Sequence, residues 1–131
     1  DAAILISLGG ALKAGADLEG ATGAYRRAIQ IDSANFPARF DLATVYYEMG
    51  RMTEALEELE SARRVKAVMA PLDLADYHYG MGAVLYATPG REPEAASHFT
   101  EALRLNPDAP QAAEVREALR QMGMSPPDRS P

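Results

Sequence analysis

The chain has 131 residues, a mass of 14.1 kDa, a net charge of −6 and a sequence pI near 4.9. This length suits one compact domain, and the acidic balance argues against nucleic-acid binding, which needs a basic surface for phosphate contacts. The basic clusters are Arg26-Arg27 and Arg63-Arg64 with Lys66. Each lies on an expected helix with acids or abundant alanine, and we interpret them as solvated faces.

The absence of cysteine and of long apolar runs narrows the class of protein further. Without cysteine there is no disulfide framework and no thiolate metal or redox site, but this does not identify the compartment. The apolar runs are too short for a transmembrane helix or a signal peptide. The chain starts at Asp1 without an initiator Met, in what reads as a helix lacking an N-cap, which indicates a processed protein or an excised fragment.

Two helices are expected over residues 2–33, where alanine is abundant and the strand-forming residues Ile, Val and Thr are sparse. The first helix runs to about Ala14 and ends at a turn that contains Gly15. The second begins near Asp17, a good N-cap residue because its carboxylate can accept a backbone N–H of the first turn. It ends near Asp32.

A second pair of helices is expected to break at Gly50-Arg51, with Thr53 as the N-cap of its second helix. This second helix can continue through Lys66 and Met69, because no proline stops it before Pro71.

A third pair is expected to break at Pro89-Gly90. Pro93 suits the first turn of the following helix, because its missing N–H has no helical partner there. Asn106-Pro107 then closes this helix.

A seventh helix is expected from about Pro110 to Met122, with Val115, Leu119 and Met122 at helical spacing. Gly123 is placed to end it. The tail, residues 123–131, is rich in proline and polar residues, and we expect it to be disordered.

The helix pairs repeat at a spacing of about 34 residues. From Leu8 to Leu42 is 42 − 8 = 34 residues, and from Leu42 to Met81 is 39, so the third pair is displaced by five extra residues. From Ala55 to Ala95 is 40, which adds one more inside the third pair. The recurring positions are Leu8-Gly9, Leu42-Ala43 and Met81-Gly82 on the first helices, and Ala21, Tyr25, Ala28; Ala55, Leu59, Ala62; Ala95, Phe99, Ala102 on the second helices.

Small residues at these positions let the two helices of a pair approach closely. Ala62→Leu should therefore overpack the pair, at a cost of roughly 1–3 kcal/mol. A single pair cannot bury its apolar faces, so the pairs must stack. Larger residues are expected to fill the remaining space: Leu8, Leu12, Tyr25; Leu42, Tyr46, Leu59; Met81, Leu85, Phe99.

This pattern resembles the tetratricopeptide repeat, a 34-residue helix–turn–helix with a W-x2-L-G-x2-Y…A-x3-F…P signature. The resemblance covers roughly residues 3–107, and 109–122 resembles its capping helix. Arg39 and His78 depart from it, since they stand where a bulky aromatic is usual. The middle repeat matches best, at Leu42, Ala43, Tyr46, Gly50, Ala55, Leu59 and Ala62.

The resemblance implies an all-α fold, a right-handed superhelix (α-α solenoid) of three helix–turn–helix repeats with a seventh capping helix. It implies a domain over 1–122, with repeats at about 2–35, 36–70 and 73–107 and the capping helix at 109–122.

The first helix of the middle repeat carries two stripes, which separate the adjacent tyrosines. Tyr46 lies on the stripe of signature positions and is expected in the core. Tyr47 lies on a second stripe that recurs in the other repeats. In proteins of this resemblance the second stripe lines a concave groove that accepts an extended peptide or a helix. The expected groove residues are Ile6, Gly10, Lys13, Phe40, Asp41, Thr44, Tyr47, Glu48, Tyr79, Ala83 and Tyr86.

Other readings of the second stripe stay open. It can be a buried contact, or a terminal tail or the capping helix of the same chain can occupy it. One subset of the family clamps the C-terminal carboxylates of heat-shock chaperones with basic residues. None of the matching positions here is basic, and we predict no binding of chaperone tails: Ile6, Gly10, Asp41, and Asp76 and Gly80 or Tyr77 and Met81.

No catalytic or metal-binding motif is present in the sequence. The only histidines, His78 and His98, lack the spacing of a metal site, and we assign no ligand or base role to them. We therefore expect a non-catalytic protein–protein interaction module without cofactor, metal, nucleic-acid or membrane partner. The alternatives are a self-associating domain, a homo-oligomer, a segment of a longer repeat array, or a docking domain of a larger protein.

Overall fold

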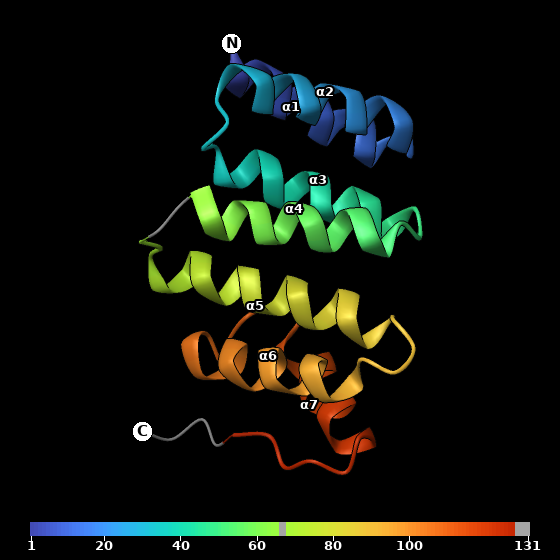
Figure 1. The fold of residues 1–131 in the computed structure, drawn as a ribbon, viewed down its shortest axis with the longest axis vertical. Helices are drawn as coiled ribbons and strands as arrows, with labels where there is room; N and C mark the ends of the chain where they lie inside the picture. The colour runs from blue at the N-terminus through green and yellow to red at the C-terminus, as the bar shows by residue number, and fades with distance from the viewer. Residues whose placement is uncertain (66–67, 128–131) are drawn as a thin grey trace. The chain divides into compact units, whose positions relative to one another are not determined.

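Seven α-helices are present in residues 1–65 and 68–127, which the computed structural model describes (Figure 1). No strand occurs in these ranges, and none of the helices within them has the length and apolar character to cross a membrane. The chain divides into two units, Asp1–Ala67 with α1–α4 and Val68–Pro131 with α5–α7. The helices are α1 (Ala2–Ala14), α2 (Leu18–Ile31), α3 (Phe36–Glu48), α4 (Met52–Val65), α5 (Pro71–Tyr86), α6 (Glu92–Leu105) and α7 (Ala112–Gln121).

The first unit consists of two helix hairpins, α1 with α2 and α3 with α4. Asp17 is the N-cap of α2, as predicted, and its carboxylate accepts the N–H of Gly20 at 2.9 Å. The prediction that α1 lacks an N-cap is wrong. The carboxylate of Asp1 accepts the N–H of Ile4 at 3.0 Å, so the first residue itself satisfies an open donor of this helix.

Close approach of α1 and α2 depends on Gly9. A Cβ at this position would lie 2.6 Å from the ring of Tyr25, a side chain only 2% exposed. The prediction that Leu8 fills the same core is wrong, since Leu8 is 45% exposed. Its equivalent on α3, Leu42, is 1% exposed because α2 packs on α3. Among the described residues of the first unit, no helix packs on α1 as α2, the helix before it, packs on α3.

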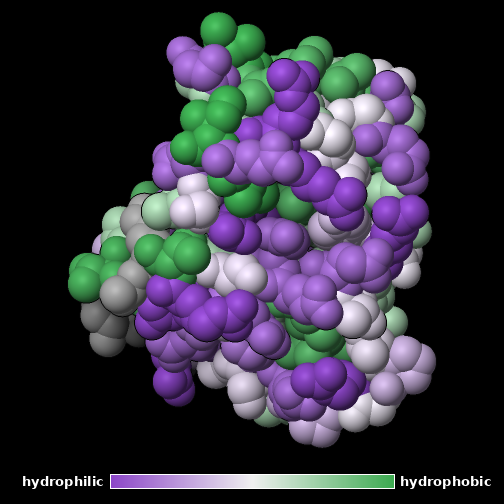
Figure 2. Space-filling view, turned by 45° about the horizontal axis from the view of Figure 1, so that its top comes forward, coloured by the Kyte–Doolittle hydropathy of each residue, from purple (hydrophilic) through white to green (hydrophobic). Residues whose placement is uncertain are grey.

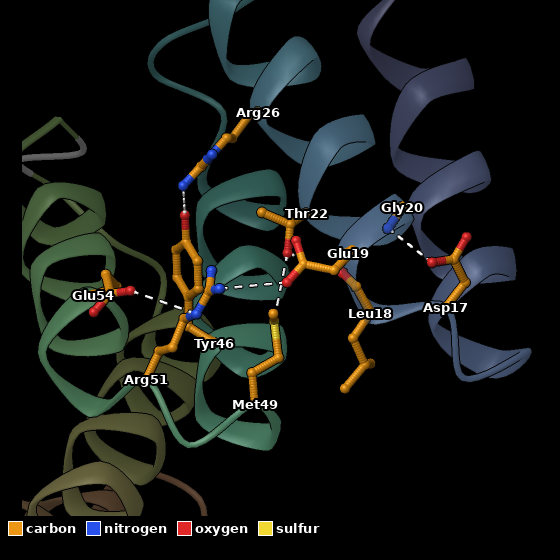
Figure 3. A network of polar contacts seen from close by, with 10 residues as sticks. All are labelled: Asp17, Leu18, Glu19, Gly20, Thr22, Arg26, Tyr46, Met49, Arg51 and Glu54. Atoms are coloured by element: carbon orange, nitrogen blue, oxygen red, sulfur yellow. Dashed lines mark hydrogen bonds and ion pairs between the residues drawn. The ribbon is translucent and has the colours of Figure 1, made fainter.

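A polar network holds α2 against the C-terminal half of α3 (Figure 3). Arg26 donates a hydrogen bond to the hydroxyl of Tyr46, and its guanidinium carbon lies 5.6 Å from the centroid of that ring. Beyond the end of α3, Arg51 forms an ion pair of 3.3 Å with Glu19 at the start of α2. Tyr46 is 3% exposed, which confirms its predicted place in the core.

Both ends of α4 differ from the prediction. Thr53 is not the N-cap: Arg51 takes that position, and its carbonyl accepts the N–H of Ala55 at 3.0 Å. Gly50, at φ +77°, makes the tight turn that lets the helix start earlier. At the other end α4 stops at Val65, and Met69 is not helical. Lys66, also assigned to this helix, lies outside the described residues.

Proline sets the start of α5 in the second unit. Ala70 is extended, with φ −61° and ψ 151°, because the ring of Pro71 disfavours a helical conformation in the preceding residue. This extended conformation excludes Ala70 from a helix that would run up to Pro71. Pro93 lies in the first turn of α6 and Asn106 follows its end, both as predicted.

The contact of α5 with α6, like that of α1 with α2, includes a glycine that faces an aromatic ring. A Cβ on Gly82 would lie 2.4 Å from the ring of Phe99, which is 3% exposed. After α6, the capping helix α7 buries Val115 and Leu119, and Gly123, at φ +79°, follows its end. The tail predicted to be disordered has no helix from Met124 to Pro127, and its residues 128–131 lie outside the described part of the chain.

Candidate partner-binding surface

Eight of the predicted groove residues lie on α1 and α3 in the first unit. We call them the α1–α3 strip. None of them is fully buried, so the side of the hairpins that carries them is at least partly open. Ile6 is the most core-like member, since it packs against a buried cluster that includes Leu5 and Ala38. The strip consists of Ile6, Gly10, Lys13, Phe40, Asp41, Thr44, Tyr47 and Glu48.

The polar end of the α1–α3 strip joins the two helices. Lys13 of α1 forms an ion pair of 3.6 Å with Glu48 of α3. Burial raises the pKa of the Asp41 carboxyl, while the ammonium of Lys13 acts in the opposite direction. The pKa of the Tyr25 hydroxyl is raised by burial and then by the charges of Asp41 and Glu48. Both carboxylates therefore lie close enough to act on the same hydroxyl.

Gly10 leaves open space beside this polar end. Apart from the neighbouring residues and the backbone of α1, the only atom of the described residues within 4 Å of a Cβ built there is the hydroxyl oxygen of Tyr25, at 3.8 Å. A side chain at this position would cover the hydroxyl, so glycine keeps the region between α1 and α3 accessible.

The aromatic members of the α1–α3 strip differ in exposure. Phe40 is half-buried and stacks on Phe36, with ring centroids 5.9 Å apart and an interplanar angle of 24°. Tyr47 is 38% exposed, whereas its neighbour Tyr46 is 3% exposed. The adjacent tyrosines thus have different surroundings, as their positions around the helix predicted.

The remaining predicted groove residues, Tyr79, Ala83 and Tyr86, form what we call the α5 strip, in the second unit. Tyr79 is 3% exposed and its hydroxyl donates to the carbonyl of Asn106 at 2.8 Å. Its pKa is raised by burial, against the guanidinium of Arg116. The chain at the end of α6 therefore contacts the hydroxyl of this residue.

Tyr86, at the other end of the α5 strip, is 38% exposed but also has partners within its own chain. Its hydroxyl donates to Gln121 Oε1 of α7 at 3.4 Å, and its ring packs edge-on against Phe99 at 6.1 Å. Ala83, between the two tyrosines, is half-buried. The chain itself therefore occupies part of the α5 strip, which was one of the readings left open by the sequence.

Two of the positions that match the chaperone-tail clamp are acids, Asp41 and Asp76, and none of these positions carries a base. Burial raises the pKa of Asp41, and burial and then the charge of Asp73 raise the pKa of Asp76. A raised carboxyl pKa means that negative charge is already unfavourable at both places. A second carboxylate brought there would increase that cost.

His78 and His98 form a contact that the sequence analysis did not anticipate. Their Nδ1 atoms lie 2.9 Å apart, between α5 and α6, and the ring centroids are 5.1 Å apart. One ring donates its Nδ1–H and the other accepts at an unprotonated Nδ1, so at least one of the two imidazole rings is neutral. The repeat spacing could have predicted this contact, because Arg39 and Glu58 occupy the equivalent positions of the middle repeat. These two residues form an ion pair of 3.2 Å.

The described residues contain no group of three or more His, Asp or Glu side chains that could hold a metal ion. A family profile described as tetratricopeptide repeat matches residues 37–108, more than half of the chain. The chain belongs to the tetratricopeptide repeat family. Its fold is accordingly the all-α solenoid of helix–turn–helix repeats, and α7 corresponds to the capping helix.

Two solved structures resemble the chain over most of its length. A Thermobaculum terrenum O-GlcNAc transferase mutant matches with a TM-score of 0.77 and 27% identity. The match covers 90% of this chain but only 22% of the transferase chain. The first tetratricopeptide repeat domain of Spaghetti (RPAP3), bound to an HSP90 peptide, SRMEEVD, matches with a TM-score of 0.79 and 18% identity over 93% of each chain. Among curated proteins, no sequence matches the chain.

Proposed function

We propose that this tetratricopeptide repeat domain is a protein–protein interaction module that binds a partner peptide or helix on the α1–α3 strip. The observation that carries the proposal is the exposure of Tyr47. Tyr47 is 38% exposed and lies on a helix whose core positions are already filled by Leu42 and Tyr46, so more than a third of this residue is open to a partner. Tyrosine combines a large contact area with a hydroxyl and few rotamers, which suits recognition.

The family context supports interaction rather than catalysis. Tetratricopeptide repeats are generally non-catalytic interaction modules, and the Spaghetti structure holds a bound peptide. We propose the same general role here, without catalysis and without a cofactor. The transferase similarity does not argue otherwise, because it spans 22% of that chain.

We also propose that the partner is not an acidic chaperone tail of the kind bound by the Spaghetti domain. Such a peptide ends in a carboxylate and needs basic side chains to receive it. The matching positions on the α1–α3 strip are Ile6, Gly10 and Asp41, and the only base in the strip, Lys13, is paired with Glu48.

Selection from a phage-displayed library of random dodecapeptides tests the proposed function. Peptides enriched on the wild-type protein are synthesised, and their affinities are measured by fluorescence anisotropy for the wild type and Tyr47→Ala. We expect the variant to bind about tenfold more weakly, which corresponds to the loss of one well-packed aromatic contact.

Ile31→Ala is the matched control, because Ile31 is 60% exposed on α2 and does not belong to the strip. It should bind the peptides as the wild type does. If no peptide is enriched, or if Tyr47→Ala and Ile31→Ala bind equally well, the proposed function is wrong. Retained helical circular dichroism in both variants shows that the comparison is made between folded proteins.

Exposed apolar residues on α1 favour the alternative function, a structural segment that packs against further repeats or against a second copy of the chain. Ile4 is 67% and Leu8 is 45% exposed, although the equivalent residues of α3, Ala38 and Leu42, are buried. Sedimentation across a concentration series distinguishes the two functions. A mass that rises with concentration in the wild type and stays near 14.1 kDa in Ile4→Glu/Leu8→Glu would favour the structural alternative.

A further inference from the structure

We propose that the partner segment bound by the α1–α3 strip carries a Lys or Arg beside an apolar residue, with Asp41 and Glu48 receiving the cation and Tyr47 contacting the apolar residue. This inference rests on the proposed function, since it names the chemistry of the partner at the same strip.

The two carboxylates face the same region from one helix. Asp41 and Glu48 are 48 − 41 = 7 residues apart on α3, two helical turns, which places both on one side of the helix. Both charges raise the pKa of the same hydroxyl, that of Tyr25, so their fields converge there. Gly10, opposite them on α1, keeps that region free of a side chain.

The negative charge of this region is incompletely balanced within the described residues. Lys13 forms its ion pair with Glu48, and no ion pair to Asp41 within 4.0 Å occurs in residues 1–65 and 68–127. Asp41 is half-buried, so its carboxylate has lost part of its hydration, and the ammonium of Lys13 acts on it only from beyond ion-pair distance. An ammonium or guanidinium from a partner would supply the missing charge and donate hydrogen bonds that are stronger than neutral ones.

Charge complementarity favours this occupant over the other candidates. An acidic segment would meet two carboxylates, and a second copy of the chain carries a net charge of −6. Tyr47 lies one residue before Glu48, and its exposed ring can contact both an apolar side chain and the stem of a neighbouring Lys or Arg. A basic and apolar pair is therefore the chemistry that uses every exposed feature of the strip.

The experiment uses the dodecapeptides enriched in the selection described above. We expect Lys or Arg at a fixed distance from an aliphatic or aromatic residue in most of them. For one such peptide, the affinities for Asp41→Asn and Glu48→Gln are compared with the wild type, together with a peptide in which the basic residue is replaced by Gln. Asp41→Asn and the Gln peptide should each bind about tenfold more weakly, as expected for a desolvated charge pair.

Lys13→Gln provides a change of opposite sign. Removing this ammonium leaves both carboxylates uncompensated, so the basic peptide should bind about threefold more tightly. Glu57→Gln is the matched charge control, because Glu57 is an exposed acid on α4 and outside the strip, and it should change affinity less than about twofold. A purely structural effect of the substitutions would not produce opposite signs at neighbouring residues.

The outcomes separate this inference from the proposed function. Enriched peptides that lose affinity for Tyr47→Ala would show that the strip binds a partner. If these peptides are acidic or neutral, or bind Asp41→Asn as tightly as Glu57→Gln, the inference that the partner carries a Lys or Arg is wrong. If the protein enriches no peptide that depends on Tyr47, both are wrong. A basic consensus together with the opposite effects of Asp41→Asn and Lys13→Gln supports both.

Discussion

The second hairpin of the first unit and the hairpin of the second unit solve the same packing problem with different residues. Ala43 and Leu59 of α3 and α4 occupy the positions of Gly82 and Phe99 of α5 and α6, since 82 − 43 = 39 and 99 − 59 = 40. All four are buried. The hairpin that carries the larger ring omits the Cβ opposite to it, and the hairpin with the smaller Leu keeps one.

The first hairpin follows the same rule, because Gly9 stands opposite the ring of Tyr25. Conserving the summed volume of a facing pair keeps the helices at a similar distance, so aromatic rings and branched aliphatics are interchangeable when the opposing residue changes as well. The comparison predicts that the two positions are strongly coupled.

Gly82→Ala should have the largest effect on stability among the changes considered. A Cβ there would lie 2.4 Å from the ring of Phe99, and the resulting overpacking should cost about 2 kcal/mol in the free energy of unfolding. In Gly82→Ala/Phe99→Leu, which reproduces the pair of α3 and α4, the loss should be smaller than the sum of the two single losses. Urea unfolding followed by circular dichroism measures all three variants.

Gly23→Ala is the control for the effect of adding a methyl group to a helix. Outside the neighbouring residues and the backbone of α2, no atom of the described residues lies within 4 Å of a Cβ at this position, so the variant should gain up to about 1 kcal/mol from helix propensity. Additive losses in the Gly82 and Phe99 cycle would show that the two side chains do not compete for the same volume.

The polar pairs across the same two hairpins predict different responses to pH. His78 and His98 share a hydrogen bond in which one nitrogen must be unprotonated, whereas Arg39 and Glu58 form an ion pair. Burial lowers the pKa of His98, although the carboxylate of Glu94 acts against this, so the folded state disfavours the charged ring. The contribution of His98 to the free energy of unfolding is therefore fully present above about pH 6.5, the ordinary pKa of histidine. This contribution is lost as the pH falls from there through the lowered pKa of the folded state.

Breaking the histidine hydrogen bond by acid should cost about 1–2 kcal/mol, measured as the free energy of urea unfolding between neutral and mildly acidic pH. His78→Arg/His98→Glu, which installs the pair of the first unit, should remove this part of the pH dependence. A wild type and double variant with parallel pH profiles would contradict the assignment.

The ion pair between Arg39 and Glu58 should contribute less. The side chains are 14% and 23% exposed, and a partly buried pair of this kind couples by about 1 kcal/mol. Arg39 also donates from Nε to the carbonyl of Ser33 at 2.9 Å, so Arg39→Met should lose more stability than Glu58→Gln. A double-mutant cycle at low and high salt isolates the pair, and a coupling energy that salt leaves unchanged would argue against its ionic character.

Local backbone demands and the repeat spacing made most of the fold predictable. Gly50 and Gly123 adopt positive φ where glycine was expected to end a helix or make a turn, and Asp17 caps α2 because its side chain needs only a neighbouring N–H. These features depend on a few adjacent residues. The repeat spacing then predicts which positions of one hairpin are buried from the equivalent positions of the next.

Features that depend on which other helix or side chain packs against a helix face were not predictable from the sequence. Periodicity indicates that Leu8 shares a face with Ile4, but it does not say whether another helix covers that face. The contact of His78 with His98 depends on side-chain directions at a helix crossing. Likewise, the hydroxyl of Tyr79 donates to the carbonyl of Asn106, which is twenty-seven residues away in sequence.

The smallest expected effects separate the two tyrosine strips. Tyr47 and Tyr86 are both 38% exposed, but only Tyr86 has a ring contact with Phe99 and a hydroxyl partner on α7 among the interactions assigned to the described residues. Tyr86→Ala should therefore cost about 1 kcal/mol in the free energy of unfolding, and Tyr47→Ala about 0.5 kcal/mol. Equal losses would mean that Tyr47 supports its own unit as much as Tyr86 does, and its exposure would then no longer argue for a partner.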